Sequence, residues 1–157
     1  MLFRSSESLP QKQQLADRLP ALLYAAIRKN AKQMLAPVFF VGVRGIRTVA
    51  KKIERLPQEP EKYQKLWLGH LVRMQEEIGT GGAGFRYLYA YFLEQAADIC
   101  ANPALQTASQ EITAIGDQWR QLASQCVKQC RRPSEQGCAQ IAAFLREIAS
   151  LDRKSVV

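Results

Sequence analysis

The sequence is poor in histidine and has no long apolar run. Its single histidine is His70, so a metal centre built from several histidines is excluded, and a histidine-dependent nucleophilic site would have to use this residue. The longest apolar stretch, around residues 37–43, is far shorter than the roughly 20 residues that a transmembrane helix needs. Residues 1–14 lack the apolar centre of a secretory signal. The expected location is therefore cytoplasmic.

Patterns typical of β-strands are also missing. The sequence shows no sustained alternation of Val, Ile or Thr, which is the signature of half-buried strands. Apolar residues recur instead three and four positions apart, as on one face of a helix. The sequence therefore predicts an all-α fold, a single-domain bundle of about six helices over residues 1–157. Residues 1–16 are expected to be a polar, poorly ordered lead, and residues 152–157 a frayed tail.

Proline and glycine mark the ends of the predicted helices. The first helix is expected to have Asp17 as its N-cap, to carry Pro20 in its first turn and to end at Pro37. The fourth helix is apolar nearly all round, which predicts a central position. The second to sixth helices are expected at about residues 40–56, from 63 to a stop at Gly79, at 84–101, around 105–126 and around 138–148.

The four cysteines are expected to be reduced. The chain is long enough to fold without disulfides, and no export signal accompanies them. Cys126 and Cys130 are one helical turn apart and Cys138 follows, but zinc sites favour shorter spacings on turns, so neither a metal nor a cofactor is expected. His70 lies in an apolar stripe and is expected to pack in the core. A small enzyme that uses His70 and one thiol is a weaker alternative.

Basic residues outnumber acidic ones, 22 against 14, for a net charge of +8. The surplus is concentrated in residues 1–60, with 11 basic and 4 acidic residues. On the second predicted helix, four cations at i, i+3, i+7 and i+11 share one ridge, and two cations of the first helix extend this surface. The ridge is Arg44, Arg47, Lys51 and Arg55, and the extension is Arg28 and Lys32.

A line of guanidinium groups on a rigid helix suits carboxylates and phosphates, because the planar fork binds either through two hydrogen bonds. Such a ridge fits an acidic protein helix, nucleic acid or an anionic membrane surface, and a simply solvated face is the plain alternative. Nucleic acid is the less expected partner. No DNA- or RNA-binding signature is present, and the aromatic residues are not interleaved with the basic ones.

A glycine-rich segment follows the third predicted helix. Its spacing satisfies G-x-G-x-x-G, but that dinucleotide motif requires a preceding β-strand, and a helix precedes it here. The segment is instead a turn whose following helix amides, with Arg86, are able to hold an anion. The favoured alternative is that Arg86 pairs with Glu76, Glu77 or Glu94 and fastens two helices together. The motif comprises Gly79, Thr80, Gly81, Gly82, Gly84, Phe85 and Arg86.

The run EIGTGGAGFRYLYAYFLE over residues 77–94, together with residues 119–123 and 42–46, resembles the helical C-terminal domain of proteins similar to butirosin biosynthesis protein H. In that family the domain follows a papain-like cysteine domain, whose nucleophile passes an acyl group from an acyl carrier protein to an amine. The cysteine domain is missing from this sequence, and none of the four cysteines matches the nucleophile. Only the glycine segment with Phe85 and Arg86 is carried over, without an assigned role.

The resemblance and the charge together predict a non-catalytic helical accessory module, which is not an enzyme on its own. Its basic face is expected to bind an acidic partner such as an acyl carrier protein, or a separate papain-like cysteine domain. The alternative is a helical protein that binds nucleic acid independently of sequence. An apolar patch left exposed by the missing cysteine domain would favour a homodimer.

Overall fold

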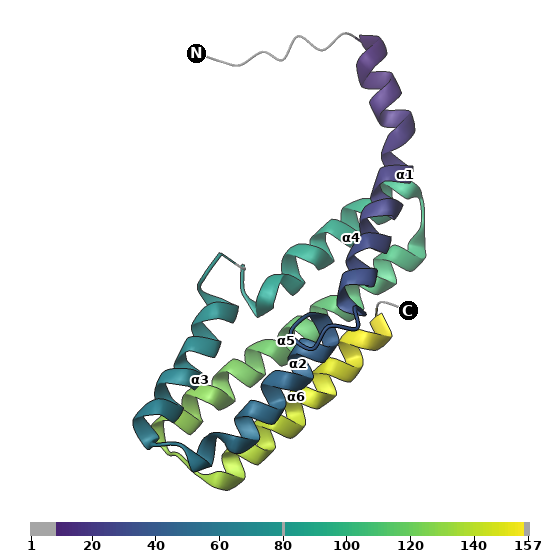
Figure 1. Cartoon of the computed structure of the whole chain (residues 1–157). Helices are drawn as coiled ribbons and strands as arrows, with labels where there is room; N and C mark the ends of the chain where they lie inside the picture. Colours follow the sequence, from purple (N-terminus) through teal and green to yellow (C-terminus); the bar gives the residue numbers. More distant parts are fainter. Residues whose placement is uncertain (1–8, 80, 156–157) are drawn as a thin grey trace.

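The computed structural model describes residues 9–79 and 81–155 of the 157-residue chain. Within these ranges all regular structure is helical, and six α-helices pack together (Figure 1). The predicted all-α bundle of six helices is therefore confirmed. The elements are α1 (Leu9–Met34), α2 (Gly42–Arg55), the short 3₁₀ helix η1 (Leu56–Gln58), α3 (Glu61–Glu76), the short 3₁₀ helix η2 (Ala83–Phe85), α4 (Arg86–Cys100), α5 (Pro103–Arg131) and α6 (Glu135–Ser155).

The long helix α5 is the axis of the bundle. Its 29 residues correspond to about 44 Å at a rise of about 1.5 Å per residue. α4 lies along its first half, where Ser109 donates a hydrogen bond to the carbonyl of Ala90 (2.7 Å). α3 lies along its second half, where the thiol of Cys130 approaches the carbonyl of Lys65 (3.7 Å). The glycine segment between α3 and α4 therefore lies against the middle of α5, while α6 packs on α5 and α2 packs on α6 (Figure 1).

The central helix is thus α5, and the expectation that the fourth helix would be central is wrong. α4 buries mainly small side chains, including Ala90, Ala96 and Ala97, which allow it to approach α5 closely. Much of its remaining apolar surface is exposed. Leu88 is 54% exposed and Tyr91 is 61% exposed. Apolar side chains of α4 are therefore exposed, and the homodimer stays a prediction.

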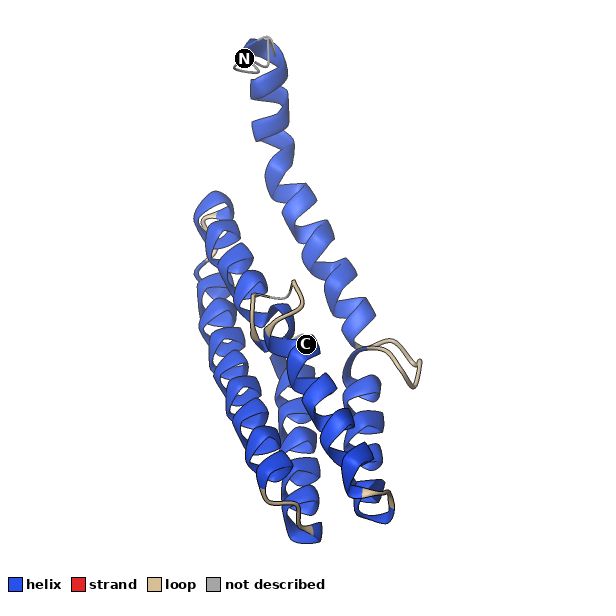
Figure 2. Ribbon diagram, turned by 90° about the vertical axis from the view of Figure 1, so that its left-hand side faces the viewer, coloured by secondary structure: helices blue, strands red, loops and turns tan. Residues whose placement is uncertain are grey.

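The first helix begins earlier than predicted. α1 starts at Leu9, so Asp17 is not its N-cap and Pro20 lies inside the helix. Residues 9–16 are rich in helix-forming Gln, Leu, Lys and Ala, which favours this extension. The N-terminal half of α1 projects beyond the other helices (Figure 2). The predicted lead is thus helical from residue 9 onward, and its residues 1–8 lie outside the described residues.

The C-terminal end is also better ordered than predicted. α6 continues to Ser155, and Asp152 near its end is only 2% exposed. The expected frayed tail is therefore wrong for residues 152–155, while residues 156 and 157 lie outside the described part. No described helix combines the length and the apolar character that a bilayer span requires.

The core lies where α5, α6 and α2 meet, with contributions from α3 and α4. Its largest fully buried side chains include aliphatic residues from five elements, which shows that one continuous core joins them. They are Ile53, Leu56, Leu68, Leu122, Leu145 and Ile148.

Replacing Leu122 by Ala should destabilise the protein by about 2–5 kcal/mol, because this side chain is fully buried in α5 and its loss leaves a cavity. Leu66→Ala is the matched control, since Leu66 is 70% exposed on α3 and its truncation should change stability by less than about 0.5 kcal/mol. Urea denaturation followed by circular dichroism measures both. Equal losses of stability would contradict the central position of α5.

Candidate functional site

The glycine segment forms a left-handed loop. Every residue from Gly81 to Phe85 has a positive φ. Glycine adopts this conformation freely, whereas Ala83 (φ 51°) and Phe85 (φ 69°) each carry a strain of about 1–3 kcal/mol. Thr80 of the predicted motif lies outside the described residues. A loop strained at two positions persists only when its surroundings hold it.

Contacts from α3 and α5 hold this loop. Glu76, the last residue of α3, accepts a hydrogen bond from the backbone amide of Ala83 (3.2 Å). Its other oxygen lies 3.8 Å from Nε of Arg120 on α5. A Cβ atom at Gly82 would come within 3.2 Å of both Arg120 and Glu76. Glycine at this position therefore leaves room for the two charged side chains to meet across the loop.

Arg86, the first residue of α4, forms an ion pair with Asp152 in the last turns of α6. Its Nη2 lies 2.6 Å and its Nε lies 3.4 Å from the two carboxylate oxygens. Nη1 donates to the carbonyl of Gly84 at 3.0 Å. The side chain of Asp152 is 2% exposed and that of Arg86 is 16% exposed. The pair is therefore largely buried, and it connects the loop, α4 and α6.

From the sequence, the expected partner of Arg86 is Glu76, Glu77 or Glu94. An acidic partner is present, but all three named residues are wrong, because the carboxylate is that of Asp152. This residue lies 66 positions away, in the segment expected to be frayed. No local spacing rule connects two residues so far apart.

The guanidinium of Arg86 also lies over the ring of a tryptophan. The central carbon of the Arg86 guanidinium is 4.5 Å from the centre of the Trp119 ring, and the buried indole N–H has no hydrogen-bond partner among the described residues. One residue further along α5, Arg120 lies over the ring of Tyr87 (4.9 Å), whose hydroxyl donates to Asp117 (2.7 Å). The glycine segment and residues 119–123, which carried the resemblance separately, thus contact each other.

A cavity of about 350 Å³ opens beside the loop, between α1, α4, α5 and α6. The ion pair contributes to its polar side, and aliphatic and aromatic side chains from three helices form the apolar side. No spacing in the sequence indicates this cavity, because its walls come from segments far apart in the chain. Its lining comprises Asn30, Met34, Gly84, Phe85, Arg86, Leu88, Tyr89, Phe92, Ile112, Asp152 and Ser155.

The predicted basic ridge is on the exposed side of α2, opposite the residues that α2 buries. None of its four cations forms an ion pair with a described acidic residue, and only Arg44 has a described hydrogen bond, to the carbonyl of Pro37 (3.3 Å). Arg28 and Lys32 are likewise exposed on α1. No described hydrogen bond or ion pair links these two residues to α2.

Two cations of α6 join the ridge, and no spacing in the sequence links either of them to α2. Arg153 and Lys154 line a surface depression together with Arg47 of α2. The nearby acid of α2, Glu54, is bound by Arg146 of α6 through two hydrogen bonds of 2.6 Å. These hydrogen bonds lower the pKa of Glu54. Because Arg146 holds this carboxylate, the ridge cations of α2 remain available to another partner.

A pair of aromatic rings lies at the N-terminal end of the ridge. Phe39 and Phe40 are each 68% exposed and contact each other edge to face, with ring centres 5.0 Å apart. Thr48 holds their loop by donating to the carbonyl of Phe39 (2.7 Å). A Cβ at Gly45 would lie 2.8 Å from the backbone of Phe40, so this glycine permits the loop to lie close against α2.

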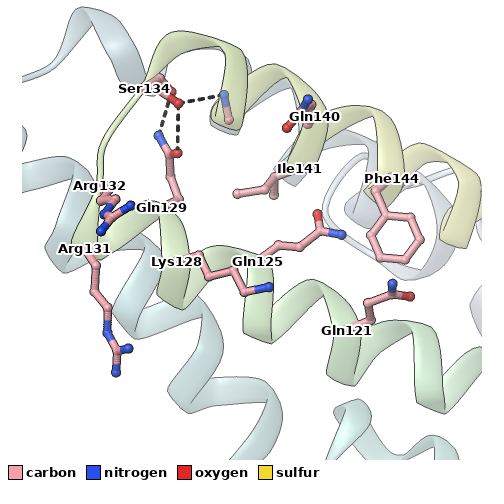
Figure 3. A pocket seen from close by; sticks show the side chains of 11 residues that line it. Gln121, Gln125, Lys128, Gln129, Arg131, Arg132, Ser134, Gln140, Ile141 and Phe144 are labelled. Carbon is pink, nitrogen blue, oxygen red and sulfur yellow. Dashed lines mark hydrogen bonds between the residues drawn. The ribbon is translucent and has the colours of Figure 1, made fainter.

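A separate hollow of about 830 Å³ lies between α5 and α6, near the turn that joins them (Figure 3). The buried Gln129 fixes this turn by donating to the carbonyl of Ser134 (2.6 Å) and lies 3.2 Å from the sulfur of Cys138. The sequence analysis did not find this hollow, since α5 and α6 form it only by packing together. Its polar lining includes Gln121, Gln125, Gln140, Lys128, Arg131 and Arg132.

Three of the four thiols have raised pKa values, and the single histidine is exposed. His70 is exposed, so its expected core position is wrong, and α3 buries Leu68 instead. Burial raises the pKa of Cys126 to about 12 and also raises the pKa of Cys130 and of Cys138. No described group of three or more His, Cys, Asp or Glu residues is placed to hold a metal ion. Since a thiol with a raised pKa is a poor nucleophile, the alternative of a small thiol enzyme loses support at Cys126, Cys130 and Cys138.

Asp152→Ala should destabilise the protein by about 3–5 kcal/mol, because it leaves the largely buried Arg86 without its counterion. Asp98→Ala is the control, since Asp98 is exposed on α4 and has no described ion pair. Thermal or urea unfolding of the two variants measures the difference. If Asp152→Ala behaves like Asp98→Ala, the ion pair is not a structural constraint.

The pKa of Cys126 predicts a loss of stability in alkali. An unfolded thiol has a pKa of about 8.5, so the folded state holds this proton more tightly up to about pH 12. The resulting stabilisation is complete below about pH 8.5 and is lost as the pH rises toward 12. The free energy of unfolding should therefore fall more steeply with pH in the parent protein than in Cys126→Ala. Parallel pH profiles from urea titrations would contradict this expectation.

Comparison with known proteins gives one match. The family model described as Domain of unknown function (DUF4872) matches residues 5–157. No curated protein and no solved structure matches the chain. The matched range includes the glycine loop, both members of its ion pair and the whole basic ridge. The chain therefore belongs to the DUF4872 family.

Proposed function

We propose that this protein is a non-catalytic helical interaction module that binds an acidic protein through its basic face. The basic face is defined as Arg44, Arg47, Lys51 and Arg55 of α2 with Arg153 and Lys154 of α6. The observation that carries the proposal is that the four cations of α2 are exposed and form no ion pair with a described acidic residue, although Glu54 lies on the same helix.

The dimensions of the face suit a helix or an extended acidic segment. From Arg44 to Arg55 the ridge rises about 16 Å along α2, at about 1.5 Å per residue. Several like charges on a rigid surface create a field that attracts an acidic partner before contact and orients it on arrival. The face therefore favours a partner that presents several carboxylates in a row.

The exposed Phe39 and Phe40 supply the apolar part of such an interface. Protein interfaces are enriched in aromatic side chains and Arg, and a few of these residues usually contribute most of the binding energy. Here two exposed rings lie on the loop before α2, to which Arg44 and Thr48 of α2 donate hydrogen bonds. This combination supports a protein partner and separates the face from a merely solvated helix surface.

The resemblance to the C-terminal domain of butirosin biosynthesis protein H-like proteins suggests which acidic protein to test. Acyl carrier proteins are acidic, and an acyl carrier protein is the acyl donor in that family. A separate papain-like cysteine domain is the second partner that the resemblance implies. Neither partner requires catalysis by this chain, whose buried thiols have raised pKa values.

The test compares two charge-reversal variants against a fluorescently labelled acyl carrier protein, with binding followed by anisotropy. Arg47→Glu/Lys51→Glu should weaken binding at least about tenfold, because attraction becomes repulsion within the face. The control Arg73→Glu/Lys128→Glu changes the net charge equally on α3 and α5 and should leave the affinity nearly unchanged. Circular dichroism verifies that both variants are folded.

The outcomes separate the alternatives. Equal weakening by both variants would show that only the net charge matters and would contradict a defined face. Displacement of the carrier protein by unlabelled DNA of any sequence, with a steep loss of DNA affinity as salt is raised, would instead favour the nucleic-acid-binding alternative. A titration with a papain-like cysteine domain under the same conditions tests the second partner.

A further inference from the structure

The cavity beside the glycine loop has the composition of a small-molecule site. Its volume of about 350 Å³ falls in the lower part of the range of about 300–1,000 Å³ that is common for ligand pockets. Its lining is mainly apolar with a few polar groups, as in most such pockets. The apolar lining residues are Met34, Phe85, Leu88, Tyr89, Phe92 and Ile112, and the polar lining residues are Asn30, Arg86, Asp152 and Ser155.

The ion pair in this lining has hydrogen-bonding capacity that no described hydrogen bond uses. A guanidinium has five N–H groups, and the described hydrogen bonds of Arg86 use three of them, two toward Asp152 and one toward Gly84. A carboxylate accepts about four hydrogen bonds, and the described bonds to that of Asp152 number two. Both members of the ion pair line the cavity. Arg86, which is 16% exposed, therefore offers a donor to a ligand, and the Asp152 carboxylate beside it, which is 2% exposed, can be reached only where it lines the cavity.

Because the ion pair is neutral overall, it restricts the charge that a ligand can carry. Arg86 and Asp152 neutralise each other inside a largely buried environment. A ligand carboxylate would be attracted by Arg86 but repelled by Asp152. A ligand ammonium would be attracted by Asp152 but repelled by Arg86. Either ion would also lose its hydration without gaining an unpaired counterion. A neutral group that both accepts and donates hydrogen bonds satisfies the pair without this cost.

We propose that this cavity binds a neutral, mainly apolar small molecule that carries an amide. The amide oxygen accepts a hydrogen bond from the Arg86 guanidinium, and the amide N–H donates to the Asp152 carboxylate. The carbon chain lies along Leu88 and Phe92. The strained loop has a part in this site, because it holds Phe85 at the cavity and directs the start of α4 so that Arg86 reaches Asp152.

This site is distinct from the basic face. The basic face is exposed and carries cations without described acidic partners, so it attracts charge over a distance. The cavity presents a neutralised pair and apolar walls, so it selects a ligand by shape and hydrogen bonding. The two proposals therefore fail or succeed separately, and Arg47→Glu/Lys51→Glu should retain the cavity's ligand binding.

Three probes with the same six-carbon chain test the charge argument on the full chain: hexanamide, hexanoate and hexylammonium. Binding is followed by two-dimensional NMR, with the indole N–H of Trp119 as reporter, because this ring lies against Arg86. A Trp67→Phe variant assigns the signal, since the chain has two tryptophans. Hexanamide should shift the Trp119 signal saturably and bind about tenfold or more tightly than either ion.

A matched pair of substitutions tests the location. Leu88 and Tyr91 are both apolar, on α4 and more than half exposed, but only Leu88 lines the cavity. Leu88→Ala should weaken hexanamide binding by about three- to tenfold, because apolar contact area is lost, and Tyr91→Ala should leave it unchanged. Equal affinity for the three probes, equal loss in both variants, or no shift with hexanamide up to its solubility limit would each overturn the proposal.

Discussion

The ion pair between Arg86 and Asp152 is the interaction on which the structure around the glycine loop depends. Its two members lie at the start of α4 and near the end of α6, and the carboxylate is almost fully buried. Leaving a buried charge unpaired is costly, so these two helix ends must meet. This requirement explains why α6 remains helical to Ser155 and why the chain accepts a strained backbone at Ala83 and Phe85.

The long helix α5 contributes residues that lie against this ion pair. Because α3 and α4 follow one another along α5, the loop between them meets the middle of that helix, where Trp119 and Arg120 lie. The same two residues lie within the range that matches the DUF4872 family model. A loop and a helix that are separate in the sequence thus form one structural unit. That unit borders the cavity on one side. Its charged side chains form ion pairs, unlike the exposed cations of the α2 ridge.

The fold was largely predictable and the sites were predictable only in part. The three- and four-residue spacing of apolar positions is a local property of each helix, so the six helices and the exposed ridge on α2 follow from it. The spacing does not predict the partner of Arg86, the central position of α5 or the exposure of His70. Each of these depends on which helices become neighbours, and amphipathic spacing contains no information about that choice.

The sequence by itself determined the helical content, the basic surplus of the first sixty residues and the glycines that permit a left-handed loop, because these are properties of single residues and their near neighbours. Only the tertiary structure decided that Asp152 would meet Arg86, that Arg153 and Lys154 would join the ridge of α2, and that a cavity would open beside Phe85. The physical reason is that these features require side chains from different helices within a few ångströms of one another, and that proximity is created by packing around α5 and α6.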